Sequence, residues 1–162
     1  MLKLFRIILL GIFCFLIFSC PQKATVKTEL PKYAEQLMEI IPKEKASFSL
    51  YRKNAIEKYV GDSNLKADTD AILLPKYETF LTLLKDIKVE SKELTELHKR
   101  KISLSEGYFN ALEQLVIAIE SGQTHQILAA RSGVKKAIEE AESWQDDLFE
   151  IAKDNDVELP KF

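Results

Sequence analysis

Two heptad seams in the C-terminal half most strongly constrain the fold of this chain. Along each seam, apolar or small residues recur at alternating spacings of three and four, the a/d pattern of packed helices. Between the seams lies SGQT, in which Gly122 is suited to end one helix and Thr124 to cap the next. The seam positions are His98, Ile102, Ser105, Phe109, Leu112, Val116 and Ile119, followed by Ile127, Ala130, Val134, Ala137, Ala141, Trp144, Leu148 and Ile151.

If the chain reverses at this turn, the two seams pair in antiparallel register. Ile119 then faces Ile127, and Phe109 faces Ala137, so that large residues generally meet small ones and the backbones approach closely. We therefore predict a helical hairpin of about residues 91–121 and 124–154, with a register that side-chain offsets shift by at most a few residues.

The N-terminal half also carries helical signals. Five glycines and five prolines are few for 162 residues, and no segment alternates with period two for long. We expect a helix from Pro31 that Pro42 kinks or ends, then a second helical run over residues 48–60 closed by Gly61.

The sequence DSNLKAD that follows is expected to form a polar loop. Asp70 is a candidate cap for a third helix that reaches Ile87, although Pro75 also allows a start nearer residue 75. The apolar stripes of the hairpin are wider than a two-helix seam, so these helices are its natural cover. The predicted fold is an all-α, antiparallel helical bundle with short loops, formed by one domain of residues 32–162.

The first twenty residues have a different character. Lys3 and Arg6 precede 12 uncharged, mostly apolar residues, 7–18. A helix needs about 20 apolar residues to cross a bilayer, whereas a shorter run after positive charges is typical of a secretory signal. An uncleaved anchor, or an ordinary signal peptide cut elsewhere, are the alternatives.

The apolar run ends in Leu16-Ile17-Phe18-Ser19-Cys20, which resembles the lipobox of bacterial lipoproteins. Phe18 is bulkier than the usual occupant, so the match is a relaxed one, in the manner of spirochaete lipoproteins. The resemblance covers residues 1–20 and implies that residues 1–19 are removed as a signal peptide. It further implies that Cys20 is diacylated and that the lipid tethers the chain to a membrane of the cell envelope. The second half of the chain is also similar, in general pattern, to small helical lipoproteins of uncharacterised function.

Residues 20–31 are then expected to form the lipidated N-terminus and a flexible tether. Pro21 stands where an Asp often retains a lipoprotein in the inner membrane, which favours the outer membrane if the organism has one. Cys14 would be removed and Cys20 consumed by lipid, so the mature chain would hold no thiol and no disulfide.

The net charge of the chain limits the kinds of partner that it is expected to bind. Loss of Lys3 and Arg6 changes the formal net charge from −2 to −4. A mildly acidic chain is not expected to bind nucleic acid, which calls for a basic surface. Attachment to the membrane is left to the lipid, and any protein partner is not identified by the sequence.

No residue pattern indicates catalysis, a cofactor or a metal. His98 and His125 are separated by 23 residues of predicted helix up to the turn, about 34 Å, and therefore cannot share an ion. HKRK (98–101) is expected to be a solvated helix face, with Glu96 pairing with Arg100. EEAESWQDD (139–147) lacks the ligand spacing of a calcium loop, and Trp144 is expected in the core. SLSEG (103–107) is equally compatible with a kink and with a continuous helix.

These observations predict a lipid-anchored, non-enzymatic envelope protein with a structural or partner-binding role. The alternative is an envelope protein that holds a small apolar ligand between its helices. An exposed apolar patch would favour the first function, and an enclosed apolar cavity would favour the second.

Overall fold

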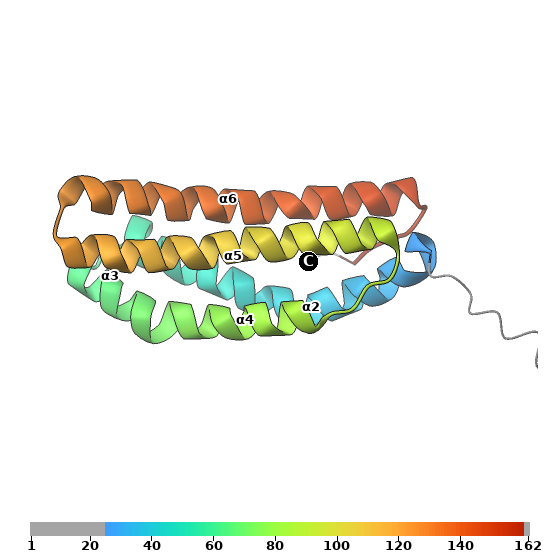
Figure 1. Cartoon of the computed structure of the whole chain (residues 1–162), viewed down its shortest axis with the longest axis horizontal. Coiled ribbons are helices and arrows are strands. Elements are labelled where there is room, and N and C mark those ends of the chain that lie inside the picture. The colour runs from blue at the N-terminus through green and yellow to red at the C-terminus, as the bar shows by residue number, and fades with distance from the viewer. Residues whose placement is uncertain (1–24, 161–162) are drawn as a thin grey trace, which may run out of the picture.

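The chain reverses at Gly122, which confirms the predicted hairpin. The structure, a computed structural model, describes residues 25–160. Helices α5 (Lys92–Ser121) and α6 (Thr124–Asp154) lie antiparallel along their whole length (Figure 1) and form the most extensive interhelical contact in this part of the chain. Gly122 adopts the left-handed conformation, with φ of 66°, and its N–H donates to the Ile119 carbonyl. The N-cap of α6 is Gln123 instead of Thr124.

Two further helical arms cover one side of the hairpin. The first is α2 (Val26–Arg52), which continues into the π-helical turn η1 (Lys53–Glu57). The second consists of α3 (Asp62–Asp68), the π-helical turn η2 (Thr69–Leu73) and α4 (Leu74–Asp86). Successive arms run in opposite directions (Figure 1), and residues 25–160 contain no strand, so the fold is the expected all-α, antiparallel bundle.

The predicted tether was wrong for residues 26–31. Helix α2 begins at Val26, and Leu30 is fully buried. Val26 and Leu30 continue the spacing of Tyr33 and Leu37 by four, three and four residues, so the helical stripe starts earlier than Pro31. The Thr28 hydroxyl accepts the backbone N–H of Thr25 and so supports this first turn. The predicted removal of residues 1–19 and the lipidation of Cys20 lie outside the described residues.

Neither proline ends helix α2. Pro31 and Pro42 both lie on its exposed side. Because proline has no N–H, the carbonyls four residues earlier, those of Lys27 and Met38, lack their usual hydrogen-bond donors, and these two residues are exposed as well. A carbonyl that faces solvent can be hydrated, so each proline costs less here than it would on the buried side.

The region around Gly61 departs from the expected pattern. Residues 62–68 form helix α3 instead of a polar loop, because Leu65 is fully buried. Gly61 marks the break between the arms with φ of 91° and is the N-cap of α3. Asp70 lies inside a helical segment and caps nothing; it pairs with Lys66 instead.

The core confirms the α6 seam and shifts that of α5. On α6, Trp144 and Leu148 are buried with most of the predicted positions. On α5 the predicted positions Ser105 and Leu112 are fully buried, but so are Leu94, Tyr108 and Leu115, which the seam did not include. Helix α5 packs against the other arms as well as α6, which turns its most buried face towards the centre of the bundle. The partly buried seam positions on α5 are Ile102, Phe109, Val116 and Ile119.

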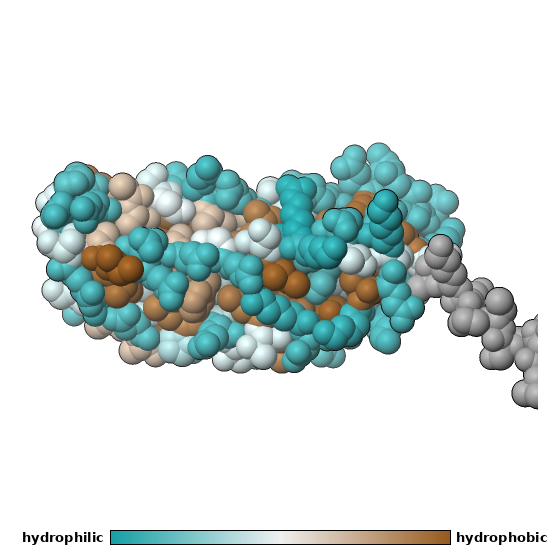
Figure 2. Space-filling model, viewed as in Figure 1, coloured by the Kyte–Doolittle hydropathy of each residue, from teal (hydrophilic) through white to brown (hydrophobic). Residues whose placement is uncertain are grey.

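The surface is mixed. Figure 2 shows hydrophilic residues over most of the visible face, with hydrophobic residues scattered between them. Ile56, Tyr59 and Val60, which the helical pattern placed on an apolar stripe, are exposed. None of the helices between residues 25 and 160 has the length and apolar character needed to cross a bilayer.

The burial of Leu30 predicts the effect of its truncation. Leu30→Ala leaves a cavity between helices and should lower the free energy of unfolding by about 3 kcal/mol. Leu128→Ala removes the same atoms from a side chain that is 59% exposed and should change the stability by less than about 0.5 kcal/mol. Urea unfolding followed by circular dichroism measures both, and equal effects would mean that residues 26–31 are not part of the folded domain.

Candidate functional site

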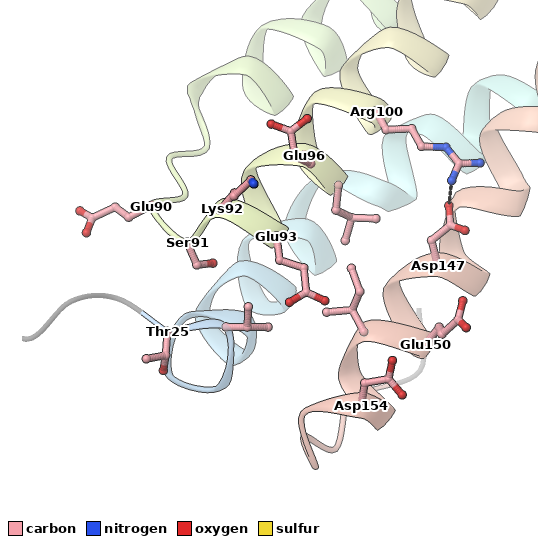
Figure 3. A pocket seen from close by; sticks show the side chains of 13 residues that line it. Thr25, Glu90, Ser91, Lys92, Glu93, Glu96, Arg100, Asp147, Glu150 and Asp154 are labelled. Carbon is pink, nitrogen blue, oxygen red and sulfur yellow. Dashed lines mark ion pairs between the residues drawn. The ribbon is translucent and has the colours of Figure 1, made fainter.

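An open groove lies at the end of the bundle where α2 and α5 begin and α6 ends (Figure 3). Its volume is about 1170 Å³. The first described residue, Thr25, lines it, so the chain leaves the described domain towards its N-terminus at the groove itself. The lining residues are Thr25, Val26, Glu90, Ser91, Lys92, Glu93, Glu96, Leu97, Arg100, Asp147, Glu150, Ile151 and Asp154.

Hydrogen bonds between the arms fix one wall of the groove. The Glu29 carboxylate on α2 accepts the backbone N–H groups of Glu90 and Ser91 and the Ser91 hydroxyl, at the start of α5. Burial raises the pKa of Glu29, but these hydrogen bonds outweigh it, and the net pKa lies below the ordinary value of a glutamate. The ionised carboxylate therefore holds the start of α2 against the start of α5.

An ion pair joins the other two walls. Arg100 on α5 pairs with Asp147 on α6, as the dashed line in Figure 3 shows. The helix pair predicted between Glu96 and Arg100 was wrong, because Glu96 pairs with Lys99 instead. Arg100 is free to reach α6 because the two helices lie side by side at this point.

The rim of the groove is acidic. Six of its residues carry carboxylates and two carry basic side chains. Asp147 is engaged by Arg100, but Glu93, Glu150 and Asp154 have no basic partner within 4 Å among the described residues. Figure 3 shows Asp147, Glu150 and Asp154 following one another along α6, with Glu93 on α5. Carboxylates gathered on low-dielectric walls focus a negative potential into the groove.

The groove also has an apolar part, formed by Val26, Leu97 and Ile151. Each comes from a different helix, and Leu97 is almost completely buried. A ligand that fills the groove therefore meets both hydrocarbon and negative charge.

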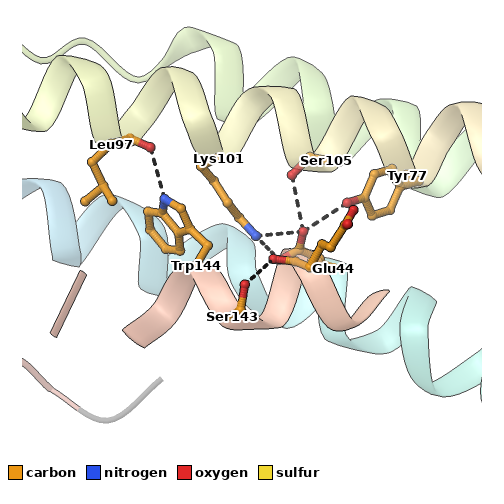
Figure 4. A network of polar contacts seen from close by, with 8 residues as sticks. Glu44, Tyr77, Leu97, Lys101, Ser105, Ser143 and Trp144 are labelled. Carbon is orange, nitrogen blue, oxygen red and sulfur yellow. Dashed lines mark hydrogen bonds and ion pairs between the residues drawn. The ribbon is translucent and has the colours of Figure 1, made fainter. Parts of the chain in front are cut away.

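Below the groove, a buried ion pair crosses the bundle (Figure 4). The Lys101 ammonium on α5 donates to both oxygens of Glu44 on α2, at 2.9 and 2.7 Å. The hydroxyls of Tyr77 and Ser105 donate to the same carboxylate, at 2.9 and 3.3 Å. The Lys101 ammonium also lies 5.2 Å from the centroid of the Trp144 ring.

This network is closed to solvent. The side chains of Lys101 and Glu44 are 1% and 3% exposed. Burial lowers the pKa of Lys101, and the charge and hydrogen bonds of Glu44 partly offset that effect. The pair joins α2 to α5 inside the bundle, out of contact with solvent. The predicted solvated face over residues 98–101 was therefore wrong for Lys101 and for His98, which is also buried, and right for Lys99 and Arg100.

The groove and the network share a connection. The Trp144 indole N–H donates to the carbonyl of Leu97 at 3.0 Å (Figure 4), and Leu97 forms part of the groove. Trp144 is 1% exposed, which confirms its predicted place in the core.

The two histidines occupy different environments. His98 is buried and bonds through Nδ1 to the Tyr33 hydroxyl at 3.1 Å, whereas His125 at the hairpin turn is exposed. Burial, together with the charge of Lys88, lowers the pKa of His98. Among residues 25–160, no three His, Cys, Asp or Glu side chains are arranged to hold a metal ion. Helix α5 runs unbroken through SLSEG, which resolves that alternative in favour of a continuous helix.

No protein-family model, curated protein or solved structure matches this sequence. The groove and the buried network are therefore interpreted from their geometry alone.

The buried pair predicts an asymmetric response to substitution. Lys101→Met leaves the Glu44 carboxylate buried without its counter-charge and should lower the free energy of unfolding by about 3 kcal/mol. Adding Glu44→Gln removes that charge and should recover more than half of the loss. Lys99→Met, on the exposed side of the same helix, serves as the control in urea unfolding and should change the stability little. A single variant as stable as the wild type would show that the pair is not buried.

The lowered pKa of Glu29 predicts a pH-dependent contribution. Above the pKa of an unfolded glutamate, the ionised carboxylate stabilises the fold, and this stability is lost as the pH falls through the lowered pKa of the folded state. Glu29→Gln should therefore be less stable by about 1 kcal/mol at neutral pH, where the partly exposed site is partly screened, and the difference should shrink as the pH falls. Urea unfolding at pH 7 and pH 3 tests this, with Glu35→Gln on the exposed face of α2 as the control. A difference of the same size at both pH values would assign the effect to packing.

Proposed function

We propose that this protein is a lipid-anchored protein of the cell envelope whose helical bundle binds a partner and catalyses no reaction. The observation that carries the proposal is the position of the groove at the end of the bundle where the chain continues towards Cys20. Thr25 is the fifth residue after Cys20, so an extended chain spans at most about 18 Å between them. A lipid on Cys20 would thus keep the groove close to the membrane.

Attachment by lipid suits a domain of this kind. Two acyl chains hold a protein stably on a bilayer, whereas one chain alone does so only marginally. The described helices supply no membrane span of their own, and the lipobox-like residues supply the attachment point.

The character of the groove favours a partner over a small apolar ligand. The alternative function needs an enclosed, mainly apolar cavity between helices. The groove is open, and eight of its 13 lining residues are charged. The nearby polar groups of Glu44 and Lys101 are buried and paired with each other, so a ligand at this end of the bundle would contact the accessible surface of the groove instead.

Lipidation at Cys20 can be tested directly. Cells grown with labelled palmitate should incorporate the label into the wild-type protein and into Cys14→Ala, but not into Cys20→Ala. Mass spectrometry should find the mature N-terminus at Cys20 with its lipid attached. Label that survives in Cys20→Ala, or an unmodified mature N-terminus, would refute the anchor.

A further inference from the structure

The groove concentrates negative charge beyond that of the rest of the chain. Its lining residues carry an excess of four carboxylates over basic groups, whereas the whole chain of 162 residues has a formal net charge of only −2. The remaining residues, taken together, are therefore not acidic. The mutual repulsion of these carboxylates is a cost to the folded domain that a positively charged occupant would relieve.

The apolar part of the groove narrows the class of occupant. A bare metal ion would make no use of Val26, Leu97 and Ile151, and no three acidic groups among residues 25–160 are close enough to hold one. Nucleic acid and anionic lipid headgroups would be repelled by the rim. A polypeptide with apolar side chains on one face and Lys or Arg beside them satisfies both parts of the lining.

We propose that the groove binds a basic amphipathic segment of a partner protein. The apolar side chains of the segment lie on Val26, Leu97 and Ile151, and its basic groups pair with Glu93, Glu150 and Asp154. The position of this partner, next to a membrane, rests on the proposed function, whereas the chemistry of the groove does not. Because charges at an interface rim mainly guide association, binding should weaken as the salt concentration rises.

The test uses the full-length protein, processed by its host and placed in nanodiscs of phosphatidylcholine. The probe is a fluorescent peptide of Leu and Lys at helical spacing, and its counterpart carries Glu in place of Lys. Fluorescence anisotropy, corrected for binding to empty nanodiscs, measures affinity. A carbodiimide, which joins an amine to a carboxylate without a spacer, then marks where the bound peptide lies, and mass spectrometry identifies the linked residues.

Two triple variants separate the groove from overall charge. The groove variant is Glu93→Gln, Glu150→Gln and Asp154→Asn. The matched control, Glu35→Gln, Glu39→Gln and Glu113→Gln, removes the same charge from exposed positions outside the groove. We expect the Lys peptide to bind the wild type and the control within about twofold of each other, and the groove variant about tenfold more weakly, as three exposed ion pairs would give. Circular dichroism checks that both variants remain folded.

Several results would overturn the proposal. These are equal weakening by the two variants, equal binding of the Glu peptide, crosslinks confined to residues outside the groove, or crosslinks that place Lys23 of this chain in the groove instead of the peptide. The experiments can refute the lipid anchor and the proposed peptide binding independently of each other. An unlipidated Cys20 with peptide crosslinked to Glu93 or Glu150 would remove the anchor alone, and a lipidated Cys20 without peptide binding would remove the groove proposal alone.

Discussion

The ion pair between Glu44 and Lys101 sets the conditions for the rest of the bundle. Two charges removed from water are tolerated only when each is paired and hydrogen-bonded, and here the carboxylate receives the ammonium and two hydroxyls. A slide of α2 along α5 would separate the pair and leave both charges buried. Because residues 25–160 contain no cysteine, no disulfide fixes that register instead. The pair thus gives the packing of α2 on α5 a specificity that interchangeable aliphatic contacts alone supply less well.

Much of this architecture could be predicted from the sequence, because the strongest pattern, that of the α5–α6 hairpin, involves only residues close together in the chain. The α5–α6 hairpin needs only a heptad spacing and one glycine that tolerates a left-handed conformation, and both are visible without knowledge of the other helices. The face of α5 was harder to predict, since a helix that contacts several neighbours turns its most buried side towards all of them. A two-helix seam describes only one of these contacts, which is why Phe109 and Val116 are only partly buried.

The polar core and the groove were missed for a different reason. Glu44 stands between Ile41 and Phe48 at spacings of three and four, and Lys101 stands between His98 and Ser105 at the same spacings, as residues on buried helix faces do. The prediction took the charge of Lys101 as a sign of exposure, because the sequence alone does not show that it pairs with Glu44 on another helix. The groove depends on where three helix ends meet, which no local pattern encodes. Its walls hold acidic residues that are unremarkable one by one along the chain.

Direct contacts connect the buried ion pair to the groove, and these contacts affect how the groove would bind the proposed partner. Leu97 contributes to the groove surface, while its carbonyl accepts the indole N–H of Trp144, whose ring lies against the Lys101 ammonium. Glu29 fixes the start of α5 on the opposite side. Surfaces held in this way lose little freedom when a ligand settles on them, so more of the contact energy remains as affinity. If a segment binds as proposed, the buried charges contribute indirectly, because they hold in place the helices that form the groove.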